Sequence, residues 1–193
     1  MRKLLRYILV LGMCVSLMLI PMSAPADSMK IAQGSMLHAR QVLERYDASG
    51  EPLLQYFELW MDASRVAQRQ LAEDGRTLSW SYSDGVSHLA WDDGTLAARK
   101  NEASAVFIMD YPLLKAGFDA QTEVSGQVYA GRPCTAILLE DNVNEEEWLK
   151  LYLDDETGFV LFCEAPLLRL RTALMETLPT DEARLTPPAG LVF

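Results

Sequence analysis

Three Asp-Gly pairs constrain the fold more than any other feature of this sequence. Asp74-Gly75, Asp84-Gly85 and Asp93-Gly94 lie ten and nine residues apart. Asp-Gly is the strongest short-range hairpin signal, because tight hairpin turns require a positive φ angle that glycine adopts without strain. Three such pairs at the spacing of a strand plus a turn predict a β-meander, with strands in "RTLSWSYS" (76–83) and "VSHLAW" (86–91).

Alternating patterns extend the β region in both directions. "YFELWMD" places Phe57, Leu59 and Met61 on one side of a strand, and "TEVSGQVYAG", "RPCTAILLED", "WLKLYLDD" and "FVLFCEAPLLRLRTALMET" follow later in the chain. We expect eight to ten antiparallel strands in a sheet that must twist and curl. The end of the chain, "RLTPPAGLVF", predicts an extended segment that crosses the surface.

Two segments favour helices. "MLHARQVLERYD" (36–47) repeats apolar residues at near-helical spacing and is followed by Gly50. "EASAVFIMDYPLLKAG" (102–117) breaks the strand pattern and fits helical pieces around Pro112. The predicted fold class is therefore α+β, mainly β: a strongly curved antiparallel sheet, an incomplete barrel, with helices covering its concave face.

The N-terminus predicts export. Arg2, Lys3 and Arg6 precede an apolar stretch from Tyr7 to Ile20, and Ala24-Pro25-Ala26 forms a small-residue exit. We expect a signal peptide over residues 1–26 and one domain over 27–193, in the periplasm or on the outer side of the cell membrane. An uncleaved anchor is the alternative, although the stretch is short for a membrane span, which needs about 20 apolar residues.

Charge argues against nucleic-acid partners. The full chain carries a formal charge of −10, and loss of three of its 17 basic residues with the leader would leave 14 against 27 acidic ones, a net charge of −13. Such a chain repels nucleic acid and anionic lipid surfaces at long range. We expect a monomer that contacts a membrane or envelope protein only transiently.

No catalytic constellation stands out. His38 and His88 are the only histidines, and neither has a carboxylate or cysteine at ligand spacing. The sequence contains no nucleophile elbow and no Gly-rich phosphate loop. We therefore expect a protein that is not an enzyme and that has no cofactor and no metal site.

The cysteines of the mature chain are Cys134 and Cys163, in strands that a meander places two apart. Next-but-one strands are separated by about 9.6 Å, twice the spacing of neighbours. A disulfide needs Cα atoms within about 7 Å. We expect two buried free thiols, and a bridge between them would show that the meander is wrong.

Residues 131–165, "GRPCTAILLEDNVNEEEWLKLYLDDETGFVLFCEA", resemble the C-terminal hairpins of the LolA/LolB-like superfamily of outer-membrane lipoprotein carriers and localisation factors. The resemblance rests on Gly131, on a strand of pattern Leu-x-Leu-aromatic-aliphatic-Asp (149–154) and on the turn Thr157-Gly158. "YFELWMDASR", "SYSDG", "DYPLLKAG" and "LTPPAG" resemble other parts of the family pattern. These motifs are structural and indicate fold more than function.

The resemblance implies an incomplete barrel with helices acting as a lid. It also implies an exported binding protein for a lipid, an acyl chain or a lipoprotein, because relatives carry or accept lipoprotein acyl chains, while others sense envelope stress. The dedicated carrier has an arginine on an early strand that helps to govern cargo release. Arg65 and Arg69 lie in the corresponding region, and neither sits in a matching motif.

Two interpretations of the large apolar residues remain open. They either pack as an ordinary core or line a ligand cavity, and the lid candidates among them either plug the sheet or open. In the second case the function is a lipid carrier, and in the first it is a regulatory or scaffolding module of the cell envelope with a filled core. The cavity candidates are Phe57, Leu59, Met61, Leu78, Trp80, Tyr82, Trp91, Phe107, Leu113 and Leu114.

Overall fold

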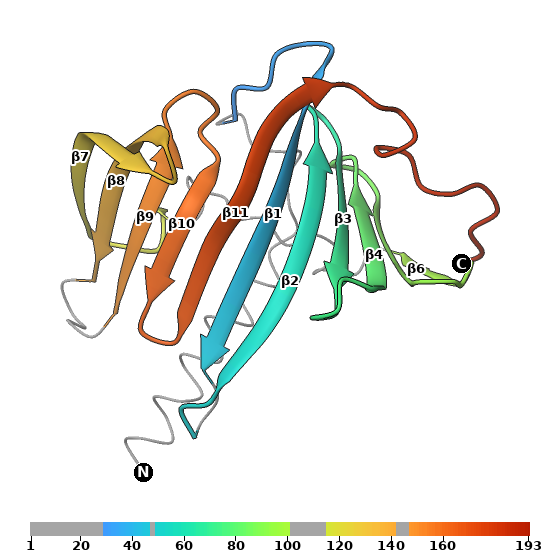
Figure 1. The fold of residues 1–193 in the computed structure, drawn as a ribbon, viewed down its shortest axis with the longest axis horizontal. Helices are drawn as coiled ribbons and strands as arrows, with labels where there is room; N and C mark the ends of the chain where they lie inside the picture. The colour runs from blue at the N-terminus through green and yellow to red at the C-terminus, as the bar shows by residue number, and fades with distance from the viewer. Residues whose placement is uncertain (1–28, 47–48, 101–114, 142–146) are drawn as a thin grey trace.

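The computed structural model describes residues 29–46, 49–100, 115–141 and 147–193, which form one eleven-stranded antiparallel sheet (Figure 1). The strands are β1 (Ser35–Tyr46), β2 (Pro52–Met61), β3 (Val66–Leu71), β4 (Thr77–Ser83), β5 (His88–Asp92), β6 (Ala98–Lys100), β7 (Ala120–Tyr129), β8 (Arg132–Glu140), β9 (Trp148–Asp154), β10 (Val160–Ala165) and β11 (Leu168–Pro179).

The sheet is unclosed and strongly curved, with β6 and β7 at its edges. Its strand order is β6-β5-β4-β3-β2-β1-β11-β10-β9-β8-β7. Every neighbouring pair is therefore consecutive in the chain except β1 and β11, which pair over eleven residue positions. Two meanders meet at this central pair.

The predicted meander is confirmed. The three Asp-Gly pairs lie in the turns β3–β4, β4–β5 and β5–β6, and their glycines have φ angles of 83°, 81° and 75°. Glycine has no Cβ to clash in this left-handed region, so the turns close without strain.

The helix predicted over 36–47 is wrong, because this segment forms β1. As a central strand, β1 is packed on both sides, and Met36, Leu37, His38 and Ala39 are all buried. A strand buried on both faces loses the simple alternation of apolar and polar residues, and its run of apolar residues then imitates helical spacing.

Helices on the concave face are not supported. No helix covers either face of the sheet in the parts of the chain that the structure describes. The predicted helical insertion over 102–117 falls almost wholly on residues 101–114, which lie outside the described ranges. The predicted signal peptide, residues 1–26, also lies outside them. Within those ranges no helix is both long and apolar enough to cross a membrane.

Asp154 fixes the turn that the family motif identified. Its buried carboxylate accepts hydrogen bonds from the Thr157 backbone N–H (2.9 Å) and hydroxyl (2.7 Å), and from Arg132 Nε (2.6 Å). Burial alone would raise the pKa of Asp154, but the bonds from Arg132 and Thr157 outweigh burial and lower it. The Thr-Gly turn therefore owes its geometry to a carboxylate that stays ionised.

Cys134 and Cys163 are free and buried, as predicted. Strand β9 separates them, and because Cys134 pairs with Asp154 whereas Cys163 pairs with Leu151, they also lie on opposite faces of the sheet. Burial raises the pKa of both thiols, which keeps them in the unreactive protonated form.

We expect neither thiol of residues 27–193 to react with iodoacetamide in the native protein, and both to react in denaturant without prior reduction. Intact mass measured after alkylation under each condition checks this expectation. A protein that needs a reductant before both thiols react would contradict the fold.

Candidate functional site

The two faces of the sheet carry different chemistry. Alternate residues of a strand point to opposite faces, and directly paired residues on neighbouring strands point to the same face. Leu59 and its neighbour Trp60 on β2 lie on opposite faces. We call the face that carries Leu59 the apolar face and the face that carries Trp60 the aromatic face.

The apolar face carries two clusters of buried, mainly aliphatic side chains from both meanders, which we call the aliphatic layer. Between Ala39 and Leu43 on β1, Gln41 is buried on the same face and donates a hydrogen bond to Thr172 on β11 (3.2 Å). Met29, Ile31, Phe118 and Phe159 pack on this layer from outside the strands. The strand residues of the layer are Leu37, Ala39, Leu43, Phe57, Leu59, Met61, Val66, Ala90, Ile137, Leu139, Leu149, Leu151, Val160, Cys163, Leu168 and Leu170.

The predicted cavity residues divide between the faces. Phe57, Leu59 and Met61 lie on the apolar face, in its two clusters. Trp80, Tyr82 and Trp91 lie on the aromatic face, and Leu78, which is in step with Trp80 along β4, is 37% exposed. Phe107, Leu113 and Leu114 lie outside the described residues. The structure therefore does not bring the described candidates into one lining.

The serines of "LSWSYS" lie on the same face as the aliphatic layer. Ser81 pairs with Gln68 and with Ala90, and Gln68 in turn pairs with Leu59. The apolar face thus carries more polar residues on β3 and β4, namely Gln68, Gln70 and the three serines, beside the buried Val66 and Ala90.

The aromatic face carries a ladder of stacked rings across four strands. His38 on β1 stacks on Trp60 on β2 with centroids 5.4 Å apart and planes 4° apart. Trp80 on β4 lies 6.1 Å from Trp60 and 6.3 Å from Trp91 on β5. On β3, which lies between Trp60 and Trp80, Arg69 places its guanidinium carbon 5.4 Å and 5.7 Å from those two ring centroids. Such cation–π contacts hold the ladder together across a strand that has no ring in it.

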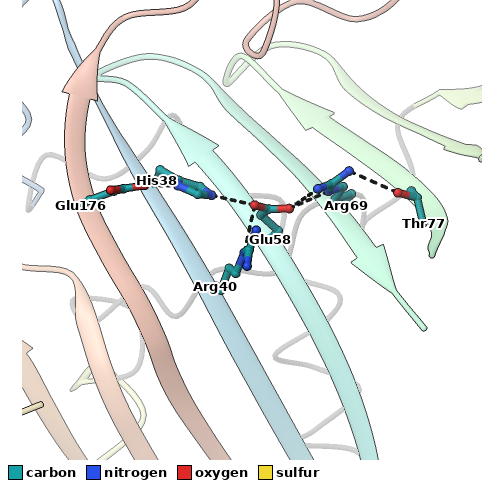
Figure 2. A network of polar contacts seen from close by, with 6 residues as sticks. All are labelled: His38, Arg40, Glu58, Arg69, Thr77 and Glu176. Carbon is teal, nitrogen blue, oxygen red and sulfur yellow. Dashed lines mark hydrogen bonds and ion pairs between the residues drawn. The ribbon is translucent and has the colours of Figure 1, made fainter. Parts of the chain in front are cut away.

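Beside the ladder, Glu58 is the centre of a buried polar network (Figure 2). Its side chain is 3% exposed. Oε1 accepts hydrogen bonds from His38 Nε2 (2.8 Å) and Arg40 Nε (3.1 Å), and Oε2 accepts two from Arg69, one of them from Nε at 2.7 Å.

The network continues to both sides of Glu58. His38 Nδ1 lies 2.7 Å from Glu176 Oε1 on β11, and Arg69 Nη1 lies 3.4 Å from the Thr77 hydroxyl on β4. Five consecutive strands of the sheet, from β11 to β4, are thus connected through side chains, as Figure 2 shows.

The charge of Glu58 is maintained by its donors. Burial alone would raise the pKa of Glu58, but the hydrogen bonds from Arg69, His38 and Arg40 outweigh burial and hold the pKa below its usual value. An ionised carboxylate can only accept, so all of these partners donate.

This network could not be found by sequence reasoning. His38 and Glu58 are 20 residues apart, and His38 and Glu176 are 138 residues apart, so no local spacing connects them. The only signal was the strand period, which places Glu58 and Trp60 on one side of β2. Because a helix was wrongly predicted over β1, the sequence did not indicate that His38 lies beside these two residues on the neighbouring strand.

The C-terminal segment covers part of the aromatic face. Leu185 is fully buried in one cluster with Met36, Trp60, Ala67, Tyr82, Leu89 and Trp91. The guanidinium carbon of Arg184 lies 5.1 Å from the Trp60 ring centroid. The prediction of an extended surface segment at the end of the chain agrees with this course.

Comparisons with known proteins identify the fold. No known family model matches the sequence, and no curated protein matches it. Among solved structures, the MucA/MucB complex of Pseudomonas aeruginosa matches with 19% identity and a TM-score of 0.55, over 80% of this chain and 56% of that chain. The chain thus spans little more than half the length of that protein.

An uncharacterized conserved protein from Thermus thermophilus matches with 9% identity and a TM-score of 0.50, over 94% of this chain and 96% of that one. The LolA superfamily protein NE2245 from Nitrosomonas europaea also matches, with 9% identity and a TM-score of 0.40, over 84% and 94% of the two chains. The unclosed, strongly curved antiparallel sheet agrees with the curved sheet that the sequence predicted. The similarities to MucB and to the Thermus protein concern the fold alone.

Proposed function

We propose that this protein is an exported, non-enzymatic binding protein of the cell envelope whose apolar face holds an acyl chain of a lipid or lipoprotein. The observation that carries the proposal is the pair of buried, mainly aliphatic clusters on one face of an unclosed, curved sheet. Such a layer binds by removing apolar surface from water, and its chemistry matches an acyl chain. Each buried CH₂ contributes about 0.8 kcal/mol before the costs of association.

The distribution of aliphatic and polar residues along the apolar face suggests how an acyl chain and its attached polar group would be oriented. The aliphatic residues are densest around β1, β2 and β8–β11, whereas β3 and β4 supply Gln68, Gln70 and serines. An acyl chain would lie over the first part, and the polar group to which it is attached would lie towards the second.

A second candidate is a regulatory module that binds a protein partner in the envelope. The fold similarity to MucB, solved in complex with MucA, favours this candidate. In that case the aliphatic layer is a filled core, and the working surface is elsewhere.

Native mass spectrometry of residues 27–193, exported and purified without detergent, separates the two candidates. We expect a co-purifying mass of a few hundred daltons that organic extraction removes and that palmitic acid restores. A bare mass, with no shift when palmitic acid or a diacylated lipopeptide is added, would contradict the carrier and favour the filled core.

Two matched substitutions locate the cargo. Ala39 and Ala67 are both buried alanines, on the apolar and the aromatic face respectively. We expect Ala39→Leu to reduce the bound fraction of palmitic acid at least fivefold, because its added carbons occupy the cargo's space, and Ala67→Leu to leave that fraction unchanged. Overpacking destabilises both variants by about 1–3 kcal/mol, so they are compared at temperatures where both are fully folded. Equal losses in the two variants would mean that the cargo does not lie on the apolar face.

A further inference from the structure

The segment that follows β11, residues 180–193, packs across the aromatic face as a strap. Figure 1 shows it leaving the end of β11 and running to β6, where the chain ends. It starts at a hydrogen bond from the Thr180 N–H to the Gly34 carbonyl (3.0 Å). We call this segment the C-terminal strap.

An ion pair provides the first anchor of the strap. Arg65, in the turn between β2 and β3, donates from Nη1 to Glu182 Oε2 (2.6 Å) and from Nη2 to Glu182 Oε1 (3.0 Å). Asp62 holds the guanidinium in place through Nε (3.0 Å) and Nη2 (2.7 Å). This bidentate geometry recognises a carboxylate specifically, and it lowers the pKa of Glu182.

A buried leucine provides the second anchor. Leu185 has no exposed surface and packs among Trp60, Tyr82, Leu89 and Trp91, with Leu191 packed against the same cluster further along. The position of Leu185 is set by a turn in which the Arg184 and Leu185 N–H groups donate to the Asp181 carbonyl (3.0 and 3.3 Å).

Backbone pairing with an edge strand provides the third anchor. The Ala98 N–H donates to the Val192 carbonyl (2.8 Å), and the Val192 N–H donates to the Leu96 carbonyl (2.7 Å), which forms a parallel bridge beside β6. The strap thus extends the sheet at this edge, as a bound peptide does when it adds to an open edge.

Between its anchors the strap is exposed. Ala183, Arg184 and Thr186 are exposed, and so are residues 188–190. A few spaced side chains and one backbone pairing therefore hold it, and such a segment opens at a lower free energy than the whole sheet. This is the contact pattern of a linear peptide in a groove and not that of a core strand.

We propose that the aromatic face is a docking site for an extended peptide, and that the C-terminal strap occupies this site within the same chain. The peptide that fits carries an acidic residue for Arg65 and an aliphatic residue three positions later for the pocket of Leu185, followed by a segment that pairs with β6. The strap competes with a partner of this kind and keeps the ring ladder covered in its absence. This proposal does not depend on the apolar cargo, because the two faces are separate.

The test uses the full chain and a fluorescent synthetic peptide with the sequence of residues 180–193. The substitution Leu185→Ser in the protein detaches its own strap, and peptide binding is followed by fluorescence anisotropy. We expect the variant to bind the peptide at least tenfold more tightly than the wild-type protein does, because a strap attached to the same chain competes at an effective concentration in the millimolar range. A peptide that itself carries Leu185→Ser should bind the variant at least tenfold more weakly.

A charge exchange tests specificity. With Arg65→Glu added to the Leu185→Ser protein, binding of the wild-type peptide should fall at least tenfold, and a peptide with Glu182→Arg should recover most of it. Equal binding to wild-type and Leu185→Ser proteins, or a Glu182→Arg peptide that recovers nothing, would overturn the proposal.

Hydrogen exchange of the wild-type protein keeps the test decisive if Leu185→Ser does not fold. We expect the amides of Leu185 and Val192 to exchange at least a hundredfold faster than those at the centres of β1 and β11, with denaturant dependence typical of local opening. If the amides of Leu185 and Val192 exchange at the same rate as those at the centres of β1 and β11, the strap is part of the core and the proposal is overturned.

Discussion

Replacing Glu58 with glutamine should lower the free energy of unfolding by about 3 kcal/mol, the largest effect that we expect of a single polar substitution in this protein. The carboxylate is buried and has His38, Arg40 and Arg69 as hydrogen-bond partners. Removing one member of such a buried pair leaves its partners without compensation, which costs about 3–5 kcal/mol, and the remaining amide oxygen recovers part of that. Urea denaturation followed by tryptophan fluorescence measures the change.

The matched control is Arg40→Gln, because Arg40 contacts the same carboxylate with a side chain that is 56% exposed. An exposed partner contributes less than about 1 kcal/mol. Equal losses in the two variants would mean that the network has no buried centre.

The effect of Glu58→Gln should also depend on pH. The folded-state pKa of Glu58 is below its ordinary value of 4.5, so its charge stabilises the fold above that pH. This contribution is lost as pH falls through the lowered pKa, where the folded state must bind the proton that the unfolded state already holds. The difference in unfolding free energy between the wild type and Glu58→Gln should therefore be large at pH 7 and smaller at pH 3. A difference that grows in acid would contradict the assignment.

Replacing Leu151 with alanine should lower the free energy of unfolding by about 2–5 kcal/mol. Leu151 is fully buried in the middle of β9, where it pairs with Ile137 on β8 and Cys163 on β10. Truncation removes apolar contact and leaves a cavity in a layer that the neighbouring strands cannot collapse to fill.

Val128→Ala is the control for Leu151→Ala, since Val128 is 69% exposed on the edge strand β7. We expect its effect to stay within about 0.5 kcal/mol. Both values come from chemical denaturation under identical conditions, and a Leu151→Ala effect as small as that of Val128→Ala would show that the aliphatic layer contributes little to stability.

The sheet could be predicted from the sequence where local signals decide it. The Asp-Gly turns located three hairpins, and the alternation in β2 correctly placed Phe57, Leu59 and Met61 on one face. The two free thiols followed from strand spacing alone.

The prediction failed where burial on both faces removes the alternation. In β1 the residues of both faces are apolar or paired, so the period-two signal was lost and a helix was predicted. The same limitation affected the candidate site: the sequence showed which residues of β2 and β4 share a face within each strand, but not how the faces of the two strands correspond. That correspondence depends on the register between β2, β3 and β4, which places Phe57 and Trp80 on different faces of the sheet.

The central pairing of β1 with β11 has a consequence for how the chain reaches this fold. Within each meander a strand pairs with the next strand along the chain, so forming each pair closes only a short loop and costs little chain entropy. The β1–β11 seam instead joins residues separated by more than 120 positions, such as His38 and Glu176, and its closure costs more chain entropy than that of any hairpin. Folding rates fall as such distant contacts increase. The seam is therefore the step expected to limit the rate of folding, and residues that join β1 to β11, such as Gln41 and Thr172, are the positions where substitution should slow refolding most.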